Sequence, residues 1–255
     1  MNQWIRGLAA MLLAMVATVA SAQPKALALG VYSFLGDGVD VTSSDDSPRD
    51  TRLERTSRET LDFRNIGFDL IALRLAREAV LAQRPGSKVM MYRSPAPMAT
   101  DEQRRLAVNA TRAELPAWMV KTIGDERLTH LLIITRNRGP ISARTGDGDA
   151  IGRGQVEGIG FYMDTLYTVR NATTGALSTG LLAPHAQFKL QLMDAMSGDI
   201  LATYDVRDAL THAAQDTQVR ADPWSFMSNE DKVRVLRQMV EDGVRRAMPD
   251  LIAKL

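Results

Sequence analysis

Acidic side chains are the most concentrated source of possible chemistry in this sequence. They gather in two polar segments, residues 35–62 and 136–182. The aspartates concerned are Asp37, Asp40, Asp45, Asp46 and Asp50 in the first segment, and Asp147 and Asp149 in the second. Several carboxylate oxygens could hold a calcium ion, but the D-x-[DN]-x-[DN]-G register of a calcium loop is absent. A solvated acidic surface is the simpler interpretation.

The same carboxylates offer one enzymatic alternative. A hydrolase or carbohydrate-binding enzyme could use Asp37, Asp45, Asp46 or Asp149 in a cleft between the two segments. Glycoside hydrolysis needs two carboxyl groups at a defined separation, and sequence spacing alone nominates no such pair. This alternative therefore stays open beside a non-enzymatic role.

The other residue types that carry catalysis stand in no recognised arrangement. The histidines, His130, His185 and His212, form no H-E-x-x-H or H-x-H pair, and the chain has no cysteine. A zinc site would therefore need ligands from distant parts of the chain. Neither a G-x-S-x-G elbow nor a G-x-x-x-x-G-K-[ST] loop occurs. We assign no catalytic residue, metal ligand or cofactor, and favour a protein that is not an enzyme.

A run of glycines is the strongest candidate for a contact surface. Gly152, Gly154, Gly158 and Gly160 share one parity, so an extended strand would place all four on one face. Such a flat face lets a ligand or another backbone approach closely. We predict that these glycines, with Phe161 and Tyr162, bind a ligand or partner. The alternative is an irregular loop followed by one bulged strand.

The clearest structural pattern is a β-hairpin from Ala183 to Arg207. Apolar residues alternate with Gln187, Lys189 and Gln191, and the alternation resumes after the turn at Ser197-Gly198-Asp199. This period of two predicts one face towards a core and one towards water.

Strands and helices alternate before that hairpin. Apolar runs predict strands at residues 25–34, 88–92 and 129–135, and helical periodicity predicts helices at 67–83, near 100–110 and from Ser228 to Pro249. We predict an α+β or α/β fold with a single mixed β-sheet, helices mainly on one face and a long glycine-rich hairpin excursion. Residues 23–255 form one domain in this interpretation, with long loops at 35–62 and 136–182.

The N-terminus has the pattern of a signal peptide. Arg6 precedes an apolar run from Leu8 to Val19, and Ala20-Ser21-Ala22 supplies small residues for cleavage. We predict cleavage after Ala22 and a periplasmic protein; the alternative is a buried N-terminal helix. No later apolar stretch is long enough to cross a membrane as a helix. The formal net charge of +1 argues against nucleic acid as a partner.

Three stretches carry a resemblance to known proteins. They are residues 154–162 (GQVEGIGFY), 180–186 (GLLAPHA) and 190–194 (LQLMD). From Lys25 onward the chain resembles exported proteobacterial proteins with no assigned function. The strand ending at Asp194, the turn after it and the closing helix are also similar to periplasmic α/β domains of curli-secretion-channel and penicillin-binding-protein-activator lipoproteins. This chain lacks their lipid-bearing cysteine.

That resemblance implies envelope assembly or regulation of a partner by binding. The expected function is therefore a non-enzymatic, envelope-associated protein that binds another envelope protein or forms a homo-oligomer. Residues 136–182 are the predicted contact segment.

Overall fold

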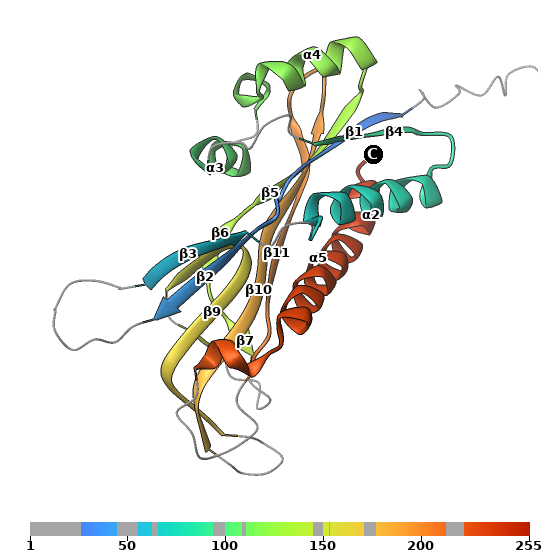
Figure 1. Cartoon of the computed structure of the whole chain (residues 1–255). Coiled ribbons are helices and arrows are strands. Elements are labelled where there is room, and N and C mark those ends of the chain that lie inside the picture. Colours follow the sequence, from blue (N-terminus) through green and yellow to red (C-terminus); the bar gives the residue numbers. More distant parts are fainter. Residues whose placement is uncertain are drawn as a thin grey trace, which may run out of the picture.

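A mixed β-sheet organises the part of the chain that the computed structural model describes (Figure 1). That part comprises residues 27–44, 56–62, 66–93, 100–108, 111–144, 150–152, 154–170, 177–212 and 222–255. The predicted signal peptide lies outside these residues, and so do Asp45, Asp46, Asp50, Asp147 and Asp149.

The strands of the sheet run in the order β3-β2-β9-β10-β5-β1-β4, with β11 on β10 and β6 on β9. Their bounds are β1 Ala28–Phe34, β2 Gly38–Ser44, β3 Thr56–Asp62, β4 Lys88–Arg93, β5 His130–Arg136, β6 Arg138–Pro140, β9 Gln155–Arg170, β10 Leu177–Asp194 and β11 Ile200–Ala209. Strand β1 is parallel to β4 and β5, and β2 is parallel to β9; the remaining pairs are antiparallel. Two short strands, β7 Ala143–Arg144 and β8 Ala150–Ile151, pair separately.

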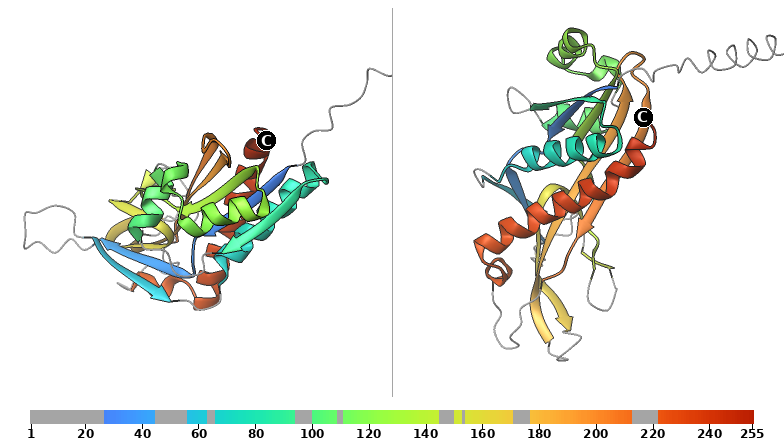
Figure 2. Two further views of the ribbon diagram at one scale, coloured as in Figure 1. Left: turned by 90° about the horizontal axis from the view of Figure 1, so that it is seen from above. Right: turned by 90° about the vertical axis from the view of Figure 1, so that its right-hand side faces the viewer.

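Strand β10 joins two halves of the sheet. Its first part, up to Gln187, pairs with β9, and its second part, from Phe188, pairs with β5 along the same edge. Strand β11 follows the opposite edge from His185 to Met193. The distal ends of β9 and β10 extend as a projecting hairpin (Figure 2), which confirms the predicted excursion.

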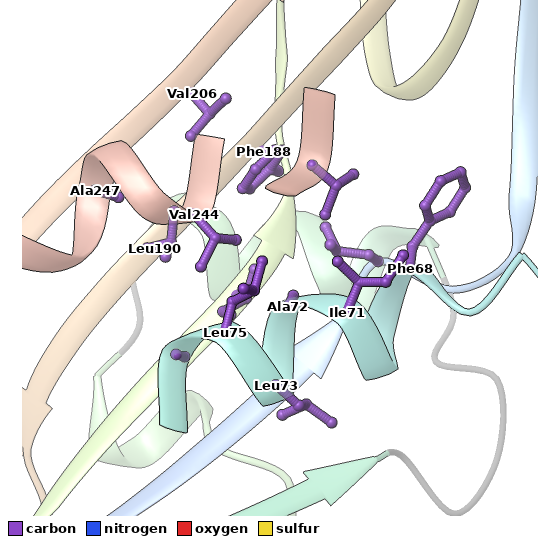
Figure 3. Packing of buried hydrophobic residues seen from close by; sticks show 14 of the residues in the cluster. Phe68, Ile71, Ala72, Leu73, Leu75, Phe188, Leu190, Val206, Val244 and Ala247 are labelled. Atoms are coloured by element: carbon purple, nitrogen blue, oxygen red, sulfur yellow. The ribbon is translucent and has the colours of Figure 1, made fainter. Parts of the chain in front are cut away.

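The longest helices cover one face of the sheet. These are α2, Phe68–Gln83, and α5, Asn229–Ile252. Residues such as Ile71 and Leu75 of α2 and Val244 of α5 meet Phe188 and Leu190 of β10 in a common apolar core (Figure 3). Helix α5 begins at the predicted cap, where Ser228 Oγ accepts from the Asp231 backbone N–H.

The opposite face carries α3, Thr100–Val108, and α4, Ala117–Glu126. Met119 and Ile123 of α4 and Leu106 of α3 pack against Tyr32 and Ile133 of the sheet. The short helices η1, Arg112–Glu114, and η2, Pro223–Phe226, complete the described elements. The fold is therefore α+β with a single mixed sheet, as predicted, and its two longest helices share one face.

One sequence prediction about exposure is wrong, and the two predicted long loops contain strands. Residues 35–62 include β2 and β3, and residues 136–182 include β6 to β9 with the start of β10, which is where the predicted hairpin lies. The supposed water face of the hairpin is buried: Gln187 and Gln191 are each 2% exposed. That face is covered because β6 crosses Gln187 and α3 lies over Lys189.

Candidate functional site

The predicted glycine face does not form. Strand β9 starts at Gln155, so Gly152 and Gly154 precede it. The φ angles of Gly152, Gly154 and Gly158 are +125°, +88° and +69°. Residues alternate strictly between faces only in extended backbone, so these positive angles break the shared parity.

The space that glycine leaves in this stretch is filled by the chain itself. A Cβ built on Gly160 would lie 1.8 Å from the backbone oxygen of Asp40 in β2, and one on Gly158 would lie 2.9 Å from Arg136 Cδ. Phe161 and Tyr162 are completely buried. The predicted close approach is therefore real, but it is an approach between strands of the same chain. Binding of a ligand or partner by these residues remains a prediction.

The carboxylates of the first acidic segment hold the backbone in place. Asp37 accepts a hydrogen bond of 2.9 Å from the Gly67 backbone N–H, just before α2. Asp40 is buried, accepts from Thr60 Oγ1 at 2.7 Å and forms an ion pair with Arg136 Nη1 at 3.1 Å. Both carboxylates are therefore engaged by groups of the chain itself.

A third carboxylate, Asp69, escaped the sequence analysis. Its helical position places it with the solvent-facing residues of α2, yet it is only 9% exposed. It accepts from Ser33 Oγ at 2.6 Å, the Leu35 N–H at 2.8 Å and the Gly36 N–H at 3.2 Å. Burial raises the pKa of this carboxyl.

Asp69 and Arg136 meet the same corner of the chain, between β1 and β2. The Arg136 guanidinium donates to the Leu35 carbonyl at 2.6 Å and to the Gly38 carbonyl. The corner thus has its N–H groups bound by a carboxylate and its carbonyls bound by a guanidinium. This arrangement fixes the joint between the two halves of the sheet, which is a structural task.

The histidines are dispersed. His130 Nδ1 lies 2.9 Å from Thr129 Oγ1, His185 is buried on β10, and burial lowers the pKa of His212. Across the described ranges, no three His, Cys, Asp or Glu side chains are grouped so that they could hold a metal ion. In the same residues no helix is long and apolar enough to span a bilayer.

The edges of the sheet are the remaining candidates. Strands β3, β4, β11 and the three-residue β6 each pair with one neighbour among the described strands. Edge strands attract other chains unless charges or irregularities protect them. The β3 sequence contains Arg58, Glu59 and Asp62, and β11 contains Asp205, Arg207 and Asp208. In β4, by contrast, the charged residues stand only at the two ends.

The interior of β4 is an apolar run, Val89-Met90-Met91-Tyr92, beside β1 (Figure 1). We call Lys88–Arg93 the β4 edge. Met91 is 43% exposed, and Val89, Met90 and Tyr92 are half-buried. The edge therefore offers apolar side chains together with a row of backbone groups that no other described strand pairs.

Aromatic packing supports this edge from the α4 side. The Tyr92 ring stacks on Tyr32 with centroids 4.7 Å apart, and Trp118 of α4 lies 5.7 Å from Tyr32. Burial raises the pKa of both tyrosines, so their hydroxyls stay neutral. A packed side chain such as Tyr92 has little conformational entropy left to lose when a second strand pairs with this edge.

Charges mark both ends of the β4 edge. Lys88 Nζ forms an ion pair with Glu126 Oε2 at 3.0 Å, and more than half of the lysine side chain is exposed. Arg93 is exposed at the other end. The ends therefore favour a segment with acidic residues on either side of an apolar stretch.

Comparison with known proteins assigns neither a family nor a function to the chain. No family model matches the chain, and no curated protein does. Among solved structures, a DUF330 protein from Xanthomonas campestris gives a TM-score of 0.37 at 10% identity, covering 92% of this chain and 89% of that one. A putative neuraminyllactose-binding hemagglutinin homolog from Helicobacter pylori gives 0.35 at 8% identity, covering 91% and 85%. At these TM-scores the likenesses assign neither a family nor a function.

Proposed function

We propose that this protein acts without enzymatic chemistry, by binding an extended segment of another protein that adds as a strand to the β4 edge. The observation that supports this best is the position of the charges on the edge strands. Strand β3 carries charges in its middle and β11 in its second half, whereas the charges of β4 stand only at its two ends, around the exposed Met91. Main-chain hydrogen bonds would supply affinity, and the alternating side chains Val89 and Met91 would select the partner.

The partner is a different chain in this proposal. Two copies of β4 paired antiparallel in register would place Lys88 opposite Arg93 at both ends. Like charges directly opposite each other destabilise a strand pair. An acidic–apolar–acidic segment would match the same edge. Self-association is therefore an outcome that the experiment must be able to detect.

We place this binding in the cell envelope. The N-terminal signal pattern and the resemblance to periplasmic domains of curli-secretion-channel and penicillin-binding-protein-activator lipoproteins support that location. The hydrolase alternative has lost support at Asp37, whose carboxylate is hydrogen-bonded to the start of α2.

The test is position-specific photocrosslinking in a Gram-negative periplasm. A photoreactive residue replaces Met91, and in a second protein it replaces Leu70, which is 59% exposed on α2. We expect one discrete partner to be crosslinked from position 91, and the same partner not to be crosslinked from position 70. Adding a charge with Met91→Lys should abolish capture of that partner by a reporter at position 93, while Leu70→Lys should not. Equal capture from both positions, or capture of a second copy of the chain, would overturn the proposal.

A further inference from the structure

A row of polar side chains is buried on the face of the sheet that carries α3. Gln187, Lys189 and Gln191 alternate along β10, and Thr135 of β5 lies directly across from Lys189. We call these four residues the polar strip. Thr135 is completely buried, and the two glutamines are nearly so. Such a row is expected on a solvated face, which is why the sequence predicted water there.

Closing this face leaves oxygens without partners. Thr135 Oγ1, Gln187 Oε1 and Gln191 Oε1 are buried and accept no hydrogen bond from any described residue. A buried polar atom that has lost water without gaining a partner destabilises the state in which it is buried. The covered state therefore carries a cost that exposure to water would remove.

Two polar contacts and one large apolar side chain join α3 to the sheet beside the strip. Lys189 Nζ donates to the Ala107 carbonyl at 2.7 Å, near the end of α3. The Arg104 guanidinium binds Glu157 of β9 twice, with Nη2–Oε2 at 2.7 Å and Nε–Oε1 at 3.3 Å. Leu106 is the large apolar side chain that α3 buries in the core.

Helix α3 has little stability of its own. It spans nine residues, and isolated helices of that length are marginal in water. The Arg104 side chain is 43% exposed, so solvent and salt screen its ion pair with the buried Glu157. These features contrast with α5, whose 24 residues bury apolar side chains along most of their length.

We propose that α3 is a cover that opens as a local unit while the sheet, α2 and α5 stay folded, and that opening admits water to the part of the polar strip at Thr135 and Lys189. Opening gives up the burial of Leu106, the hydrogen bond from Lys189 and the ion pair of Arg104 with Glu157, and it returns Thr135 Oγ1 to water. Local opening of this kind is the expected behaviour of an element with few buried apolar contacts. The proposal is independent of whether the β4 edge binds a partner.

Hydrogen exchange of the full chain tests the opening. In low concentrations of urea, amides of residues 102–108 should exchange at a rate that urea hardly changes, whereas α5 amides should accelerate steeply. Glu157→Gln should speed exchange in α3 about tenfold or more and leave α5 unchanged, because a charge-assisted pair is lost. The matched control is Glu241→Gln, which removes a partner of Arg245 on α5 and should not affect α3. Exchange of α3 that follows the urea dependence of α5 would overturn the proposal.

Thiol labelling provides a second, independent measurement. The chain has no cysteine, so Thr135→Cys introduces a single reporter beneath the cover. Labelling of the folded protein at a rate that does not depend on urea, and that rises in the Glu157→Gln background, is expected. Labelling that appears only with global unfolding would contradict local opening.

Discussion

Replacing Gly160 by alanine tests whether β2 and β9 are packed as closely as the structure indicates. The new methyl carbon would lie 1.8 Å from the Asp40 carbonyl oxygen, 2.7 Å from its carbon and 2.9 Å from its nitrogen. All three are backbone atoms, so no side-chain rotation can relieve the contact. Gly160 does not have a positive φ, so the expected loss arises from crowding between strands and not from backbone strain.

The magnitude follows from what must move. Ordinary carbon–oxygen contact requires the strands to separate by more than an ångström, which breaks ladder hydrogen bonds between residues 40–44 and 160–164. Each ladder bond contributes about 0.5–1.5 kcal/mol net, and overpacking adds about 1–3 kcal/mol. We expect Gly160→Ala to lower the free energy of unfolding by about 3 kcal/mol, and therefore the Tm by about 6–12 °C.

Urea unfolding followed by circular dichroism measures this loss. Gly86→Ala is the matched control, because a Cβ there meets nothing within 4 Å and the φ angle is not positive. The control should stay within about 0.5 kcal/mol of the natural chain. A Gly160→Ala protein as stable as the control would refute the close β2–β9 contact, and would return Gly160 to the group of residues free to meet a ligand.

Three further substitutions test other parts of the fold by urea unfolding. Gly243→Ala should cost about 1–2 kcal/mol, because its Cβ would lie 2.7 Å from Phe188 Cζ; a gain from helix propensity alone would contradict this packing. Gly124→Ala in α4 should instead gain about 0.5–1 kcal/mol, since its Cβ would meet nothing within 4 Å. Burial raises the pKa of Asp69 above 3.8, so the folded chain binds the carboxyl proton more tightly than the unfolded chain does. The free energy of unfolding therefore falls as the pH rises from below 3.8 through the folded-state pKa. Asp69→Asn should remove that fall; a variant with unchanged pH dependence would contradict the assignment.

The sequence predicted those elements that are determined by residues close together in the chain. The periodicity of α2, the cap at Ser228 and the turn at Gly198 each depend on residues a few positions apart. The turn forms as predicted, with the Gly198 N–H bound to the Asp194 carbonyl at 2.9 Å and a φ of +80°. Helix α5 differs slightly, since it continues past Pro249 to Ile252.

Features that depend on distant partners could not be predicted this way. Strand β2 is polar in sequence, and it becomes buried because β9 pairs beside it from the other half of the chain. Gln187 and Gln191 follow the alternation of polar and apolar residues along β10. That alternation cannot predict whether another element covers the polar face of the strand. The glycine parity failed for another reason: it assumed extended backbone at positions that adopt positive φ.

The candidate site shows the same division. The apolar character of residues 88–92 was visible in the sequence as a short strand. Its position at the edge of the sheet was not, because edge and interior strands differ in what pairs beside them. Comparing the positions of the charges on β3, β4 and β11 was possible only after the topology was known.

The position of β10 in the chain has a consequence for how the molecule folds. Strand β1 binds residues near the start of β5, with Ala28 N–H reaching Thr129 across 101 positions, and both halves of the sheet then require β10. Pairings over such sequence distances form slowly, because closing a long loop precedes the contacts that reward it. A growing chain that has not yet reached Leu177 lacks the strand common to both halves. The two halves of the sheet therefore cannot be joined until most of the chain has been synthesised, although β1 can already pair with β4 and β5, and β2 with β3.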